Sequence, residues 1–181
     1  TFSRRFDVDQ AHAARVKDTA LHRLDQVREP WQLDHPDYAP MVGWAAELHE
    51  IGLAVSHSQY QKHGAYLISN ADLSGFTRQE QVVLAALILG HRRRFPVEAF
   101  LELPTGLHCC TRRLCAILRL AVLMHRGRSP DSIPALTLSA DADTLVLRFP
   151  EGWLDQHPLT HLELEEEASR LLAGGFGLDF G

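Results

Sequence analysis

Apolar residues recur at helical spacing along most of the first 127 residues, and at alternate positions in two short stretches after them. A spacing of three or four residues places apolar side chains on one face of a helix, whereas alternation is typical of a strand. The pattern therefore predicts a mainly α-helical protein that ends in a small α+β part. The expected helices cover residues 7–27, 40–51, 62–70, 77–89 and 107–125.

Residues that start or stop helices stand at the ends of these stretches. Asp7 followed by Gln10 has the pattern of a capping box at the first helix, and Pro30 closes it. Pro40 is expected at the start of the second helix. Thr77 and Glu80 form the clearest capping box, because an apolar helical run follows them directly.

The character of the chain changes after Arg128. Prolines at positions 130 and 134 indicate a linker, and residues 136–139 and 145–149 alternate like two strands joined by a turn at 140–143. An acidic amphipathic helix over 159–173 ends at two glycines, and 176–180 is a candidate third strand. We therefore predict two domains, an all-helical one over 1–128 and a small α+β one over 129–181.

Length and composition are those of a soluble globular protein, with 181 residues of which 45% are hydrophobic and 23% charged. No transmembrane run or signal peptide is evident. Three cysteines, Cys109, Cys110 and Cys115, do not form a disulfide framework, so we expect small buried residues in a reducing compartment. The expected location is the cytoplasm, including the periphery of the inner membrane. The chain begins at Thr1 without an initiator methionine, so we expect a fragment or a processed product.

The net charge of −5 is unevenly distributed along the chain. Residues 91–128 carry eight arginines against two glutamates, while residues 129–181 carry ten acidic groups against two arginines. The central basic block indicates either an anion-binding surface or solvated arginines on helix faces.

His49 and Glu50 form the most suggestive pair of polar residues, because they end an otherwise apolar helix. Neighbouring residues on a helix can both reach the rim of one cavity, and imidazole and carboxylate groups bind divalent metals. Additional ligands would come from His12, His63 and His91 on other helices, which is how helical bundles build metal sites. The alternative is that His12, His49 and His63 are core histidines held by hydrogen bonds.

Four segments together resemble a known family: A-A-E-L-H-E-I-G-L at 45–53, K-H-G-A-Y-L-I-S-N-A-D-L-S-G-F at 62–76, H-R-R-R at 91–94 and L-R-L-A-V-L-M-H-R at 118–126. The order of histidines and carboxylates is similar to the HD superfamily of metal-dependent phosphohydrolases. More closely, the segments resemble the C-terminal half of bacterial exopolyphosphatases and guanosine pentaphosphate phosphatases. The similarity covers nearly the whole chain and is most specific over residues 45–94.

The HD resemblance assigns each metal position to a residue of this chain. His12 takes the first histidine position, His49 and Glu50 take the His-Asp pair, and His63 and His91 resemble the extra histidines of two-metal members. The final aspartate falls on Val122, which cannot bind a metal. The resemblance therefore implies an HD-like bundle with a degenerate metal site.

In the exopolyphosphatase family, catalysis belongs to an N-terminal pair of actin-like domains that use Mg²⁺, and this chain contains nothing like them. The resemblance implies that this chain handles the substrate, inorganic polyphosphate or guanosine pentaphosphate (pppGpp), and helps to form a homodimer. It implies no catalytic residue and no cofactor in this chain. The expected phosphate-binding groove is lined by Lys62, His63, His91, Arg92, Arg93 and Arg119.

Two other functions stay open at this point. One is an autonomous HD phosphohydrolase that acts on nucleotides through its own metal, and the other is an interaction module with a vestigial pocket. Nucleic-acid binding is not expected, because the basic block lacks interleaved aromatic residues that would stack on bases.

Overall fold

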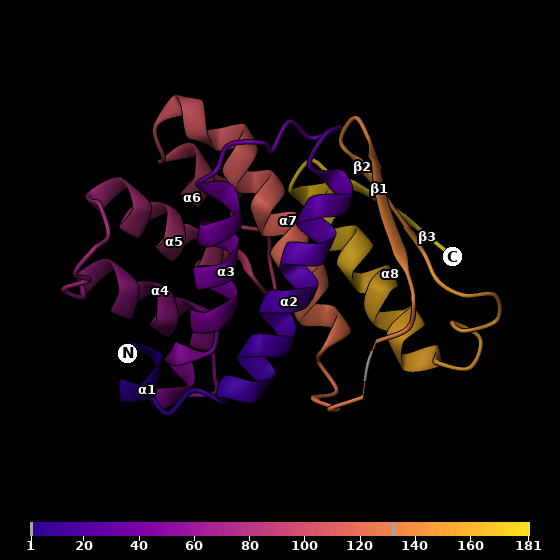
Figure 1. Cartoon of the computed structure of the whole chain (residues 1–181), viewed down its shortest axis with the longest axis horizontal. Helices are drawn as coiled ribbons and strands as arrows, with labels where there is room; N and C mark the ends of the chain where they lie inside the picture. The colour runs from indigo at the N-terminus through magenta and orange to yellow at the C-terminus, as the bar shows by residue number, and fades with distance from the viewer. Residues whose placement is uncertain (1, 132) are drawn as a thin grey trace.

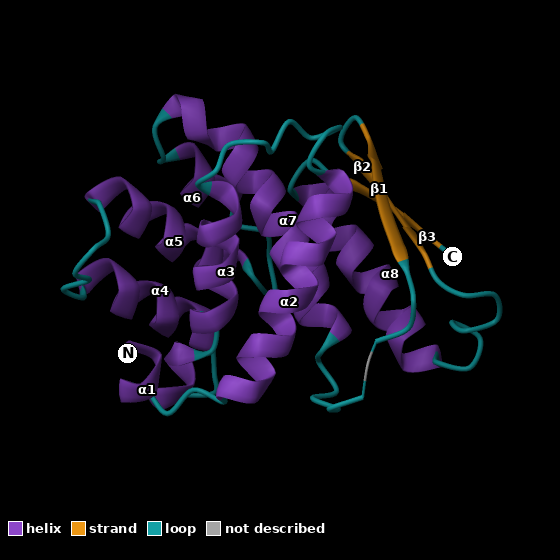
Figure 2. Ribbon diagram, viewed as in Figure 1, coloured by secondary structure: helices purple, strands orange, loops and turns teal. Residues whose placement is uncertain are grey.

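The computed structural model describes residues 2–131 and 133–181, so the predictions about Thr1 lie outside the described residues. Its helices are α1 (Phe2–Arg5), α2 (Gln10–Val27), α3 (Tyr38–Leu48), α4 (Tyr60–Asn70), α5 (Arg78–Gly90), α6 (Val97–Leu101), α7 (His108–Met124) and α8 (Pro158–Ala173), with short 3₁₀ turns at Ile51–Ala54 and Thr105–Leu107. Its strands are β1 (Thr137–Asp141), β2 (Thr144–Arg148) and β3 (Gly177–Phe180). The predicted class, a helical bundle followed by a small α+β part, is confirmed (Figure 2).

The first long helix begins later than its sequence pattern suggested. Asp9 is the N-cap of α2, and its carboxylate accepts a hydrogen bond from the backbone N–H of His12 at 3.0 Å. Asp7 instead lies in the turn after α1 with a positive φ of 51°, two residues before the cap. The prediction of Asp7 as the cap was wrong, and the short helices α1 and α6 were not predicted at all.

The capping box at the start of α5 is confirmed. The Thr77 hydroxyl accepts a hydrogen bond from the backbone N–H of Glu80 at 3.1 Å, and the Glu80 carboxylate accepts one from the backbone N–H of Thr77 at 2.7 Å. Two backbone donors that a helix start leaves without partners are therefore satisfied by side chains.

The helical bundle packs around α7, which contacts α2, α3, α5 and α6. Helix α2 also packs along α3, and α4 packs along α5 (Figure 1). Apolar spacing within the predicted helices predicts that Leu48, Ile51, Leu87 and Leu118 face the core, and all four are buried. The periodicity therefore located the inward faces of these helices correctly.

The small sheet has the order β1-β2-β3. Strands β1 and β2 form an antiparallel hairpin in which Thr137 pairs with Arg148, and β3 runs parallel to β2 after the chain returns through α8. Figure 1 shows α8 and the sheet on the side of the bundle formed by α2 and α7, away from α4 and α5.

One continuous hydrophobic core extends from the bundle into this C-terminal part. The buried ring of Trp31 lies 5.4 Å from the ring of Phe176, and its indole N–H donates to the carbonyl of Ala142 at 2.8 Å. The boundary at residue 128 stays a prediction, and the shared core shows that the two predicted parts stabilise each other. Among the described residues, no helix is long and apolar enough to cross a membrane.

Candidate functional site

Three of the predicted metal ligands lie together at one end of the bundle. His12 is in the first turn of α2, His49 ends α3, and Glu50 follows it directly. Their ligand atoms are within 4.8 Å of one another, and all three residues are buried. The distance from His12 Nε2 to Glu50 Oε1 is 3.7 Å. The sequence-based grouping of these three residues therefore matches their positions.

Backbone carbonyls set the orientation of two histidines in this region. His49 Nδ1 lies 2.6 Å from the carbonyl oxygen of Ala46, and His91 Nδ1 lies 2.5 Å from that of Ile88. A carbonyl only accepts hydrogen bonds, so each Nδ1 carries the proton and each Nε2 keeps its lone pair. Burial lowers the pKa of His49 and lowers that of His91 further, so both rings are neutral at pH 7.

Arg128 holds the carboxylate of this cluster. Its Nη1 donates to Glu50 Oε2 at 2.8 Å, and its Nη2 donates to Asp9 Oδ2 at 3.1 Å. The hydrogen bond to Glu50 raises the pKa of Arg128, and burial lowers the pKa of His12 despite the nearby Glu50 charge. The permanent positive charge beside Glu50 is therefore the guanidinium of Arg128.

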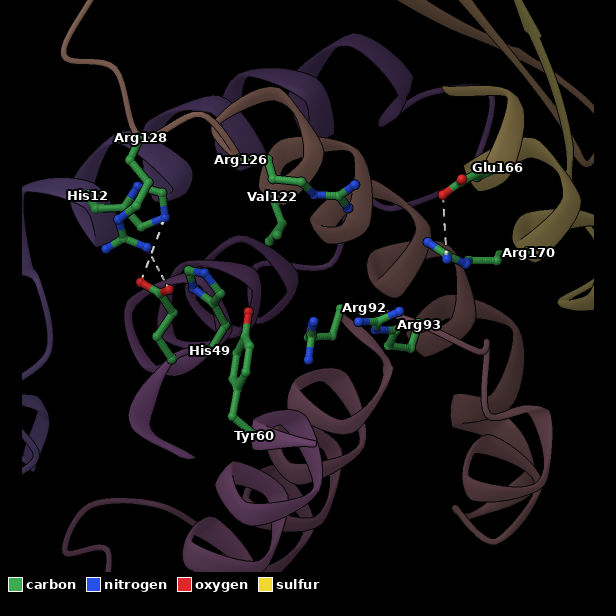
Figure 3. A pocket seen from close by; sticks show the side chains of 11 residues that line it. His12, His49, Tyr60, Arg92, Arg93, Val122, Arg126, Arg128, Glu166 and Arg170 are labelled. Carbon is green, nitrogen blue, oxygen red and sulfur yellow. Dashed lines mark hydrogen bonds and ion pairs between the residues drawn. The ribbon is translucent and has the colours of Figure 1, made fainter. Parts of the chain in front are cut away.

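A cavity of about 280 Å³ opens beside this cluster, and we call it the arginine pocket. Side chains from four helices and from the segments that follow α3, α5 and α7 line it: His12, His49, Glu50, Tyr60, Arg92, Arg93, Val122, Arg126, Arg128, Glu166 and Arg170 (Figure 3). Five of these residues are arginines and two are glutamates, and burial keeps the two histidines neutral. The pocket therefore carries an excess of positive charge, which attracts anions.

Most of these arginines are held in place by neighbours. The guanidinium of Arg92 lies over the Tyr60 ring at 4.3 Å and donates to Gln61 at 3.1 Å. Arg126 pairs with Glu163 at 3.6 Å, and Arg170 pairs with Glu166 at 3.7 Å. Such partners restrict the long side chains before a ligand arrives, which reduces the entropy lost on binding.

A second cavity of about 590 Å³ lies on the other side of Arg92 and Arg93, and we call it the Lys62 groove. It is lined by His57, Ser58, Gln59, Gln61, Lys62, Leu89, Arg92, Arg93, Arg94, Pro96 and Glu98. Because Arg92 and Arg93 line both cavities, the two are adjacent and share these two cations.

Two residues predicted to contact phosphate are used inside the protein instead. The Arg119 guanidinium is 2% exposed and donates to both carboxylate oxygens of Glu167, to the carbonyl of Gly90 and to that of Arg93. His91 is 1% exposed and lines neither cavity. The prediction that these two side chains contact a solvent-borne anion is corrected, because neither reaches the surface.

His63 also stands apart from the predicted cluster. It is a half-buried residue of α4, outside the group formed by His12, His49 and Glu50, and it lines neither of the two cavities. Its predicted roles in metal and phosphate binding are therefore corrected as well. Lys62, the residue before it, does line the groove, as predicted. Adjacent positions on a helix point in different directions, which explains the difference.

The sequence reasoning missed several residues of the arginine pocket, namely Tyr60, Arg126, Arg128, Glu166 and Arg170. Arg126 follows Val122 by four residues, and this helical spacing would have placed it near the same cavity. Arg170 and Glu166 come from α8, and the sequence has no signal that brings this helix to the histidines. Arg128 was recognised only as one of the eight arginines of the basic block over residues 91–128.

The donor set does not fit a resident HD-type metal. Glu50 Oε2 accepts a hydrogen bond from Arg128, and Val122 offers only carbon atoms at the position of the final aspartate. With the Glu50 carboxylate held by Arg128, His12 and His49 are the two ligands without a competing cation, fewer than the three protein ligands of a catalytic zinc site.

The helical bundle, the small sheet and the arginine pocket define a mainly helical protein with a positively charged cavity. The comparison with known families then shows which family it belongs to. The chain belongs to the family described as Ppx/GppA phosphatase, domain III, whose model matches residues 1–168. This finding confirms the resemblance to exopolyphosphatases and guanosine pentaphosphate phosphatases.

Similar proteins include three that are each named guanosine-5'-triphosphate,3'-diphosphate pyrophosphatase. The chain is 37% identical over 166 residues to the protein of Aeromonas hydrophila, covering 92% of this chain and 34% of that protein. It is 34% identical over 165 residues to the protein of Aeromonas salmonicida, covering 91% and 33%. It is 33% identical over 177 residues to the protein of Pseudoalteromonas translucida, covering 98% and 35%. The chain therefore spans about a third of the length of these relatives.

Proposed function

We propose that this chain is the C-terminal, polyanion-binding region of an exopolyphosphatase or guanosine pentaphosphate phosphatase. In this proposal it binds inorganic polyphosphate or pppGpp and guides it, without catalysing hydrolysis by itself. Actin-like domains elsewhere in the same protein would release the terminal phosphate with Mg²⁺. Family membership and the names of the relatives support the hydrolase class of the whole protein.

The observation that carries the proposal is the convergence of five arginines on one pocket. Guanidinium groups match the geometry of phosphate oxygens and stay charged at every physiological pH. Only Glu50 and Glu166 oppose them on the pocket wall, and both already pair with an arginine. A phosphate group would therefore find charge and hydrogen-bond donors that face it from several sides.

The two adjacent cavities favour an extended ligand over a single phosphate. Arg92 and Arg93 stand between the arginine pocket and the Lys62 groove, so a phosphate chain could contact both cavities at once. Each added phosphate would meet a further cation along this path. The affinity should therefore increase with chain length and decrease with salt, because the contacts are electrostatic.

We further propose that the whole protein is a homodimer. Helix α8 exposes Leu159 and Leu162, which are 68% and 51% exposed, on the outside of the molecule. Exposed apolar side chains close together on one helix are common at protein interfaces. Sedimentation of the full-length protein would reveal its mass in solution, and a monomer at micromolar concentration would contradict this part of the proposal.

Isothermal titration with long-chain polyphosphate, tripolyphosphate and orthophosphate, at low and high salt, tests anion binding. Changing Arg92 and Arg93 to alanine together should weaken long-chain binding by about tenfold or more, since contacts to charged groups contribute about 1.5–3 kcal/mol each. The effect on orthophosphate should be much smaller, because one phosphate contacts fewer cations.

The matched control is the double change of Arg4 and Arg5 to alanine. These arginines are exposed in α1 and line neither cavity, so the change removes the same charge elsewhere. Equal loss of affinity in both double variants would mean that net charge alone is responsible. Equal affinity for long and short phosphates would instead favour a vestigial interaction module.

A further inference from the structure

Arg128 places a permanent positive charge beside Glu50, next to the histidines that would bind a metal ion together with this carboxylate. The arginine lies in the turn after α7 with a positive φ of 56°, and its guanidinium reaches back to Glu50 at 2.8 Å and to Asp9 at 3.1 Å. Two carboxylates therefore hold one guanidinium, and Figure 3 shows Arg128 beside His12. The side chain of Glu50 is only 8% exposed, so this contact takes place at the edge of the core.

Apart from Arg128, the residues around Glu50 have the properties of metal ligands. His49 donates its Nδ1–H to a backbone carbonyl and leaves its Nε2 lone pair free, as metal-binding histidines usually do. The ligand atoms of His12, His49 and Glu50 lie within 4.8 Å of one another, and they would have to move closer together to form zinc bonds of about 2.0–2.2 Å. Two imidazoles and one carboxylate suit divalent transition metals such as Zn²⁺ and Co²⁺.

A buried carboxylate beside two neutral rings needs a compensating positive charge. Arg128 supplies that charge and also supplies hydrogen bonds that satisfy the Glu50 oxygen. Arg128 contacts Oε2 of Glu50, so a metal ion bound through Oε1, the oxygen that lies 3.7 Å from His12 Nε2, would stand directly beside a second cation. The charge of Arg128 therefore disfavours a metal ion at Glu50.

We propose that Arg128 is a fixed cation in the place of the metal, and that His12, His49 and Glu50 form a latent divalent-metal site that Arg128 keeps closed. The site is built from this chain alone and does not depend on the proposed polyphosphate binding. Unlike an ion, the arginine cannot dissociate, so the positive wall of the arginine pocket persists without any metal supply.

The test is metal binding by the chelator-treated protein, followed with Zn²⁺ by calorimetry and with Co²⁺ by its visible absorption. The wild-type chain should bind weakly. Arg128→Ala should bind one equivalent about tenfold more tightly or better, because Glu50 is released from a charge-assisted hydrogen bond. Combining Arg128→Ala with His49→Ala should abolish the gain and the Co²⁺ absorption band.

Arg126→Ala is the matched control, because Arg126 lines the same pocket but pairs with Glu163 instead of Glu50. It should leave metal affinity near the wild-type value. An equal gain in Arg126→Ala would show that the general positive charge of the pocket, not the contact with Glu50, repels metal. Wild-type protein that already binds as tightly as Arg128→Ala would also overturn the proposal.

A milder variant protects the test against unfolding of Arg128→Ala, which circular dichroism would detect. Asp9→Asn removes one of the two carboxylates that hold Arg128, and asparagine is as good an N-cap as aspartate for α2. It should bind metal more tightly than wild type and less tightly than a folded Arg128→Ala. No gain in either folded variant would mean that the three residues are not a latent metal site.

Discussion

At the scale of single residues, arginine has two different roles in this protein: some arginines are buried structural residues, and others face a cavity. Arg119 is sealed inside, where it joins Glu167 of α8 to two backbone carbonyls near α5. Arg92 and Arg126 also have partners, but part of each side chain lines the arginine pocket. An arginine is available to a ligand only where its own partners leave donors free. Burial, and not residue type, therefore separates structural from candidate binding arginines here.

The buried pair of Arg119 and Glu167 should contribute strongly to stability. Changing Glu167 to alanine leaves the Arg119 guanidinium buried and without its carboxylate, and we expect a loss of about 3–5 kcal/mol of unfolding free energy. Urea denaturation followed by circular dichroism measures this loss. The neighbouring change Glu166→Ala removes a more exposed partner of Arg170 and should cost less than about 1 kcal/mol. Similar losses in the two variants would contradict a special role for the buried pair.

At the scale of elements, helix α7 organises the site because its different faces contact α8, the arginine pocket and the core. Arg119 points to α8, Val122 lines the arginine pocket, and Leu118 is fully buried. Arg126, just after the end of α7, lines the same pocket. The turn after the helix then brings Arg128 back to Glu50. Helix α5 is the other contributor, since it ends at Gly90, immediately before His91 and the arginines that separate the two cavities. The geometry of the pocket therefore depends on where these helices begin and end.

The start of α5 offers a test of how much its capping box contributes to the stability of the protein. Thr77→Ala removes the side-chain half of the capping box, and we expect a loss of about 0.5–2 kcal/mol of unfolding free energy. Thermal and urea denaturation would quantify it. Gln79→Ala changes an exposed position within the same first turn and should be neutral within about 0.5 kcal/mol. A neutral Thr77→Ala would show that packing of α5 alone holds its start in place.

At the scale of the whole molecule, the arginine pocket is an assembly of distant segments. It combines His12 near the N-terminus, Arg92 from the middle and Arg170 near the C-terminus. The common core and the contact between Arg119 and Glu167 keep α8 against the bundle, so the last segment holds its position relative to the first. A positively charged cavity without a complete set of metal ligands suits anion binding better than metal-assisted hydrolysis.

We therefore expect the isolated chain to hydrolyse neither polyphosphate nor guanosine nucleotides. Phosphate release would be measured with Mg²⁺, Mn²⁺ and Co²⁺ in turn. The physical reason is that Val122 cannot bind an ion and that Arg128 occupies Glu50. Clear turnover that His49→Ala abolishes would contradict this expectation and would favour an autonomous phosphohydrolase. Turnover that survives His49→Ala would point to a contaminating enzyme.

The sequence by itself determined the local structure and the class of the protein. Apolar periodicity located the long helices and their inward faces, alternation located the hairpin, and Thr77 with Glu80 marked one helix start, because these features depend on nearby residues. The adjacent His49 and Glu50, with His12 one helix earlier, also predicted a buried cluster that the structure contains. The short motifs over residues 45–94 were specific enough to predict the family that the comparison shows.

Only the tertiary structure decided which charged residues face a cavity. Nothing near Arg119 in the sequence indicates that Glu167 will meet it 48 residues later, and nothing near Arg128 indicates a contact with Glu50 78 residues earlier. His63 and Lys62 are adjacent, yet only Lys62 lines the groove. The direction and partners of a long polar side chain depend on helices packed from distant parts of the chain, so one-dimensional spacing cannot specify them.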